Sequence, residues 1–72
     1  IQDESIEALS EALVQLGLVN KRAEEVARMK YILGIPTPII ANLFKVSDRT
    51  IRGDWRFAQA WLRRQLSAQR GM

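Results

Sequence analysis

The residues whose spacing best suits the binding of a ligand are four arginines in the C-terminal part of this sequence: Arg49, Arg52, Arg56 and Arg63. At about 100° per residue on a helix, all four fall within a stripe roughly 60° wide. A guanidinium is a permanent cation whose planar donors match phosphate oxygens and the major-groove edge of guanine. The stripe therefore predicts either a nucleic-acid contact face or, more simply, a solvated charged surface.

The charges around this stripe are poorly balanced. Only Asp48 stands four positions before one of these arginines, Arg52, where it could pair along a helix. Residues 1–20 contain four acidic and no basic side chains, whereas residues 45–72 contain seven basic and two acidic ones. A polyanion would be attracted to the C-terminal half of the chain, which favours nucleic-acid binding over a merely solvated face.

If the segment with the four arginines is a helix, its apolar side chains form a second stripe, separate from the arginines. Between about 180° and 260° from Arg49 lie Ile51, Trp55, Ala58, Leu62 and Leu66. This is the pattern of a helix with one face in a core, so Trp55 is expected to pack internally. Trp61 lies on the flank of the stripe, where it is expected either to cover an edge of the core or to meet a partner.

Capping residues divide the preceding sequence into further helices. The first helix carries an apolar stripe formed by Ile6, Leu9, Leu13 and Leu16. Asp3 or Ser5 is expected to cap its start, and Gly17 to end it in a left-handed conformation. The second helix is expected to begin after the N-cap Asn20, to run to about Leu33 and to be closed by Gly34.

The segment "GIPTPIIANLF" predicts a short third helix over about Pro38–Phe44, with Thr37 as its N-cap. Ser47 is the expected N-cap of the long last helix, which has Asp48 in its first turn. A short helix, a three-residue turn and a longer helix form a helix-turn-helix. We therefore expect an all-α fold, in which residues 1–72 make a single small four-helix domain with a long C-terminal recognition helix.

Several classes of function find no support in the composition. The chain has no cysteine and no histidine, so it offers no thiolate metal site and no imidazole base. Asp48 and Asp54 stand six residues apart on the last helix and point to different sides. No run approaches the roughly 20 apolar residues that span a bilayer, and the defined caps argue against a helix lying on a membrane.

We expect a cytoplasmic protein that is not an enzyme and needs no cofactor or metal. The chain opens on Ile1, so we also expect a fragment of a longer protein.

The run "DWRFAQAWLRRQL", residues 54–66, and "VSDRT", residues 46–50, carry a resemblance to a known family. Over roughly residues 6–67 the chain resembles region 4 of bacterial extracytoplasmic-function (ECF) sigma factors, their C-terminal helix-turn-helix domain. The resemblance implies a promoter-recognition domain for transcription initiation. Such domains place the last helix in the major groove of the −35 element and dock on the β flap of RNA polymerase. Anti-sigma factors commonly compete for these surfaces.

Candidate DNA contacts follow from the positions that match the family. They are Ser47, Arg49, Thr50, Arg52 and Arg56. Arg49 and Arg52 are expected at base edges, because they lie in the first turns of the helix. Ser47, Thr50 and Arg56 are expected to hold phosphates and set the register. The alternative is a protein-interaction module of the same fold, which binds RNA polymerase or an anti-sigma factor with little DNA affinity of its own.

Two residues of the helix-turn-helix depart from the family pattern. Gly53 stands where lysine or arginine is usual, which removes one DNA contact and costs about 1 kcal/mol of helix propensity. It either lets DNA or a partner approach closely or reflects a relaxed demand on this face. Lys45 stands where the turn usually has glycine, and it bears a steric cost if that position needs a positive φ.

The opening of the third helix also departs from the pattern. Pro36, Pro38 and Ile39 replace a more polar sequence. We expect Ile39 or Ile40 to be exposed there, either as a contact patch or because the start of the helix is rearranged.

Overall fold

The computed structural model describes residues 2–70 of the chain, with side chains from residue 7 to residue 67. These residues form four helices: α1 (Gln2–Val19), α2 (Lys21–Tyr31), α3 (Thr37–Phe44) and α4 (Asp48–Arg70). No strand occurs among them, so the expected all-α, four-helix architecture is confirmed.

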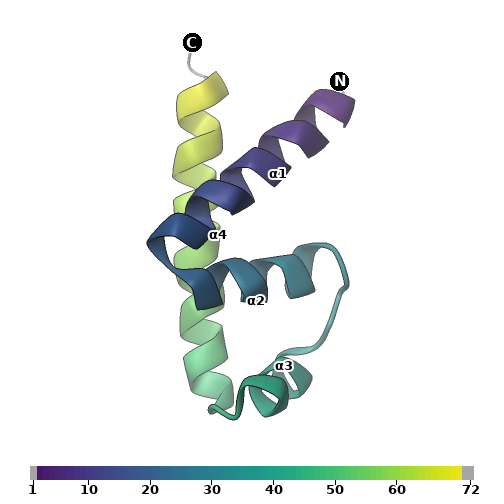
Figure 1. The fold of residues 1–72 in the computed structure, drawn as a ribbon, viewed down its shortest axis with the longest axis vertical. Helices are drawn as coiled ribbons and strands as arrows, with labels where there is room; N and C mark the ends of the chain where they lie inside the picture. The colour runs from purple at the N-terminus through teal and green to yellow at the C-terminus, as the bar shows by residue number, and fades with distance from the viewer. Residues whose placement is uncertain (1, 71–72) are drawn as a thin grey trace.

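Helix α4 forms the long axis of the molecule. At about 1.5 Å per residue its 23 residues extend for about 35 Å, close to the longest dimension of the fold, 39 Å. Helices α1 and α2 cross α4, and α3 lies beside its N-terminal end (Figure 1). The start of α1 and the end of α4 lie at the opposite end of the molecule (Figure 1). In the first turn of α4, Ile51 shares a buried cluster with Val26 of α2 and with Ile40 and Ala41 of α3.

The junction between α1 and α2 differs from the expectation at Gly17. The prediction that Gly17 ends the first helix is wrong, because α1 continues to Val19 and only Gly34 among the glycines of the described chain has a positive φ. A Cβ at position 17 would meet the carboxyl group of Glu24 on α2, whose Cδ lies 2.8 Å away. Gly17 is thus a point of close approach between two helices.

The N-cap of α2 is as predicted. The side-chain Oδ1 of Asn20 accepts a hydrogen bond of 3.1 Å from the backbone N–H of Ala23. At the start of α1, the two expected caps Asp3 and Ser5 lie inside the helix, and their side chains are outside the described part of the chain, as is that of Ile6.

The connection from α2 to α3 corrects two predicted helix bounds. Helix α2 ends at Tyr31, two residues before the expected Leu33, and Gly34, the residue expected to close it, follows with a left-handed φ of 64°. The prediction that Thr37 caps the third helix is wrong by one residue, because Pro36 occupies the N-cap and Thr37 is already helical. Pro36 has the extended backbone typical of an N-cap but no side-chain acceptor, so α3 starts without a side-chain cap. Pro38 consequently falls at the second helical position.

The core consists of two clusters of buried side chains that meet at Trp55. The first joins α1, α2 and α4 through Ala12, Leu13, Leu16, Ala23, Ala27, Ala58 and Leu62. The second joins α2, α3 and α4 through Val26, Ile40, Ala41 and Ile51. Half-buried Trp55 packs against both clusters. The predicted apolar stripe of α4 therefore faces the core, and the opposite side of the helix faces solvent.

Candidate nucleic-acid interface

The turn between α3 and α4 depends on a strained residue. Lys45 has φ 58° and ψ 45°, so the lysine occupies the left-handed conformation for which glycine is best suited. Its N–H donates back to the end of α3, and the N–H of Val46 donates to the carbonyl of Ala41 at 3.0 Å. Phe44 and Val46 pack against the second core cluster. These contacts fix the direction in which α4 leaves the turn.

Ser47 is the N-cap of α4, as predicted. Its Oγ accepts a hydrogen bond of 3.1 Å from the backbone N–H of Thr50 and lies 3.0 Å from Thr50 Oγ1. The two hydroxyls therefore bridge each other at the exposed start of the helix. Asp48 adds a negative charge to the first turn, where the helix dipole favours it.

The arginines of the first turns of α4 form an open basic face. Arg49, Arg52 and Arg56 are exposed, and none makes an ion pair within 4.0 Å with any residue that the structure describes. The one pair that the sequence spacing permits, between Asp48 and Arg52, is thus not formed. Arg49 and Arg56 are two turns apart, about 10 Å along the axis, which fits within a DNA major groove about 12 Å wide.

The candidate contacts thus gather at one end of the molecule. Ser47 and Thr50 touch each other, and the three arginines share one face by helix geometry. Arg63 is also exposed but lies about 10 Å beyond Arg56. It borders a different feature, described below.

Asp54, an acidic residue of α4 near this face, pairs with α2 and with none of the three arginines. Asp54 is buried and accepts a hydrogen bond of 2.6 Å from Arg22 Nε, so an ion pair joins α2 to α4. Asp54 is therefore a structural anchor. This pair could not be predicted from the sequence, because its partners stand 32 positions apart.

A second ionic cluster stiffens α2 itself. The carboxylate of Glu24 accepts from Arg28 Nε at 2.7 Å and from Lys21 Nζ at 3.4 Å. Burial opposes ionisation of Glu24, but these hydrogen bonds and charges outweigh it and hold the pKa of its carboxyl below the usual range.

Aromatic side chains fill the space between α2 and α4. The ring of Tyr31 meets the ring of Trp55 edge to face, with centroids 4.8 Å apart, and Lys30 Nζ lies 5.9 Å from the Trp55 ring. Trp55 is thus packed internally, though half-buried. Trp61 is also partly buried and packs on the first core cluster, so of the two expectations for Trp61 the structure shows the edge of the core.

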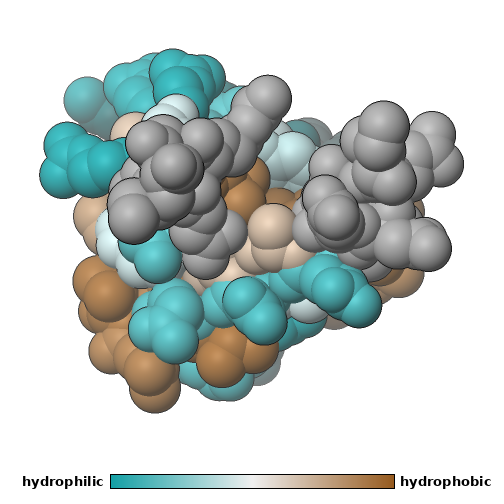
Figure 2. Space-filling view, turned by 90° about the horizontal axis from the view of Figure 1, so that it is seen from above, coloured by the Kyte–Doolittle hydropathy of each residue, from teal (hydrophilic) through white to brown (hydrophobic). Residues whose placement is uncertain are grey.

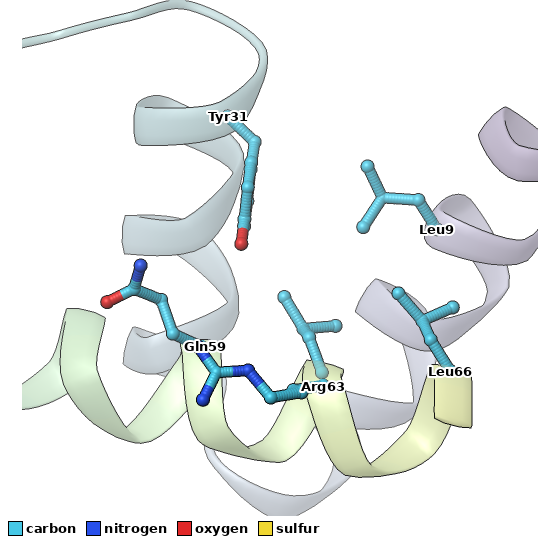
Figure 3. A pocket seen from close by; sticks show the side chains of 6 residues that line it. Leu9, Tyr31, Gln59, Arg63 and Leu66 are labelled. Atoms are coloured by element: carbon cyan, nitrogen blue, oxygen red, sulfur yellow. The ribbon is translucent and has the colours of Figure 1, made fainter. Parts of the chain in front are cut away.

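A shallow groove of about 330 Å³ lies beyond this aromatic contact. Figure 3 shows Leu9 of α1, Tyr31 of α2, and Gln59, Arg63 and Leu66 of α4 around it.

No group of His, Cys, Asp or Glu side chains within the described residues could hold a metal ion. None of the described helices is long and apolar enough to cross a membrane.

The short α3, the three-residue turn and the long α4 with its basic face define a helix-turn-helix protein of the DNA-binding kind. Comparison with known families identifies it further. The sequence model described as "ECF sigma factor" matches residues 1–68, so the chain belongs to the ECF sigma factor family and has a role in transcription initiation. This is a family of transcription factors, not of enzymes. No curated protein and no solved structure matches the chain significantly.

Proposed function

We propose that residues 1–72 form a region 4 domain that recognises the −35 promoter element and directs RNA polymerase to promoters in the cytoplasm. The observation that carries this proposal is the face formed by Arg49, Arg52 and Arg56, three exposed and unpaired cations at the start of a capped helix. A merely solvated charged face would be expected to contain ion pairs with neighbouring carboxylates. Here Asp48, in the same first turn, pairs with none of the three arginines, and Asp54 is bound to Arg22.

Each candidate residue has a distinct role in this proposal. Arg49 and Arg52 reach base edges, where a bidentate contact to guanine contributes about 1–3 kcal/mol of discrimination. Arg56 lies one turn farther along and holds a phosphate. Ser47 and Thr50 position the start of the helix against the DNA backbone, since their hydroxyls already fix each other.

A second function, binding of a protein partner, is supported by exposed apolar side chains. Ile39 is 52% exposed, whereas Ile40 is fully buried, which decides between the two residues expected at the surface. Large apolar side chains are also exposed at Val14, Leu18, Val19, Ile32, Leu33 and Leu43. Figure 2 shows hydrophobic side chains at the surface beside hydrophilic ones. Exposed apolar area of this kind suits the β flap of RNA polymerase or an anti-sigma factor.

The test is selection of this chain against random DNA duplexes, followed by anisotropy titration of the selected duplex at two salt concentrations. The proposal predicts a recovered motif and an affinity that falls steeply with salt, because cations on the protein replace counterions on the phosphates. Recovery of no motif, with only weak and salt-sensitive binding, would instead favour the protein-partner function.

A further inference from the structure

Gly53 is a glycine that the folded chain does not need. It lies in the second turn of α4, is exposed, and has no positive φ. An ideal Cβ built on Gly53 meets nothing within 4 Å. The other two described glycines have structural reasons, because Gly34 has a φ of 64° and Gly17 faces Glu24. Neither backbone conformation nor packing therefore explains Gly53.

The surroundings of Gly53 are the basic face itself. On a helix, residues three and four positions apart are neighbours, so Gly53 lies beside Arg49 and Arg56 and directly follows Arg52. All three arginines are exposed and unpaired among the described residues. Gly53 thus leaves a stretch of helix backbone without a side chain at the edge of the basic face.

Glycine inside a helix lowers the stability of that helix, and a domain of this size is only marginally stable. A residue that breaks a local preference without any structural gain points to a functional requirement. Here the requirement is the absence of a side chain, because a glycine lets another backbone come close.

We propose that Gly53 is the point at which DNA approaches α4 most closely, and that its missing side chain sets how deeply Arg49 and Arg52 enter the groove. This inference rests on the proposed DNA-binding function. It makes Gly53 a specificity-determining residue, since only deep insertion brings the two arginines to base edges, whereas phosphates remain reachable from farther out.

The test compares Gly53→Ala with the unaltered chain in two assays. Because alanine removes the helix penalty and meets no atoms, the midpoint of thermal unfolding should rise by about 4–8 °C. Affinity for a duplex selected by the unaltered chain should nevertheless fall by about tenfold, the loss of one good base contact. Affinity for an unrelated duplex of equal length should change by less than about twofold, because phosphate contacts dominate it.

Two further variants make the outcome decisive. Ser10→Ala, at an exposed position of α1, gives a helix-stabilised control that should bind both duplexes normally. Gly53→Lys adds a cation to the face, yet it should also bind the selected duplex less tightly. Equal or tighter binding of the selected duplex by either Gly53 variant would overturn the inference while leaving the DNA-binding function intact. If the unaltered chain binds no duplex, both the proposed function and the role of Gly53 are wrong.

Discussion

Gly17 and Gly53 are both helical glycines, and the structure predicts opposite effects on stability when each is replaced by alanine. At Gly53 the new methyl group meets no atoms. At Gly17 it overlaps the carboxyl group of Glu24, which must move. Glu24 is not free to move without loss, because Arg28 and Lys21 hold its carboxylate.

The magnitudes decide the sign of each effect. Both substitutions gain about 1 kcal/mol of helix propensity. Gly17→Ala also displaces the Glu24 carboxylate from Arg28, whose side chain is 39% exposed; a charge-assisted bond at such a site contributes about 1–2 kcal/mol. The Lys21 contact contributes little, since that side chain is 73% exposed. Crowding between packed helices costs a further 1–3 kcal/mol or so. Gly17→Ala should therefore destabilise the fold by about 1–4 kcal/mol, and Gly53→Ala should stabilise it by about 1 kcal/mol.

Urea unfolding followed by circular dichroism measures both effects. A double-substitution cycle isolates the cause: in a Glu24→Ala background the obstacle is gone, so Gly17→Ala should become stabilising by about 1 kcal/mol. If Gly17→Ala stabilises the unaltered chain as much as Gly53→Ala does, the close approach of α1 and α2 at Gly17 is wrong.

Three further predictions concern single side chains. Because the pKa of Glu24 is lower in the folded chain than in the unfolded one, its contribution to stability is complete above the unfolded value of about 4.3. That contribution is lost as pH falls through the lower, folded value, so urea titrations between pH 3 and 7 should show a steeper acid loss for the unaltered chain than for Glu24→Gln; parallel profiles would contradict this. Lys45→Gly removes a left-handed lysine and should raise the free energy of unfolding by about 1 kcal/mol; an unchanged urea midpoint would show that Lys45 bears no strain. Asp54→Ala breaks the pair with Arg22, whose side chain is 44% exposed and can be rehydrated. Asp54→Ala should lower the free energy of unfolding by about 1–2 kcal/mol, between the values for surface and buried ion pairs. A urea midpoint unchanged by the substitution would mean that the pair does not anchor α4.

Features encoded by neighbouring residues could be predicted from the sequence. The caps at Asn20 and Ser47 need only a side-chain oxygen three positions before a backbone N–H, and both are present in the structure. The buried apolar stripe of α4 could be predicted for the same reason, since the spacing of residues along one helix defines it. The start of α3 was misplaced by one residue because two nearby prolines, Pro36 and Pro38, both suit a helix start.

Features that depend on contacts between distant segments could not be predicted. The role of Gly17 follows from a side chain on another helix, and the anchor between Arg22 and Asp54 joins α2 to α4. For the candidate site, the sequence placed Arg49, Arg52 and Arg56 on one face, and the structure shows that face to be exposed. Their contacts with DNA stay a prediction, because neither periodicity nor burial identifies what an exposed cation binds.

The central claim is that Arg49 and Arg52 read DNA bases, and a charge-matched pair of double variants tests it most directly. Arg49→Ala/Arg52→Ala and Arg63→Ala/Arg64→Ala each remove two exposed cations from α4. Anisotropy titration of the selected duplex should show a loss of at least about 30-fold for the first variant, since two base contacts contribute about 1–3 kcal/mol each. The second should lose less than about tenfold, as expected for cations that act only through the general field. Equal losses in the two variants would mean that α4 attracts DNA only by its charge, and the assignment of base contacts to Arg49 and Arg52 would be wrong.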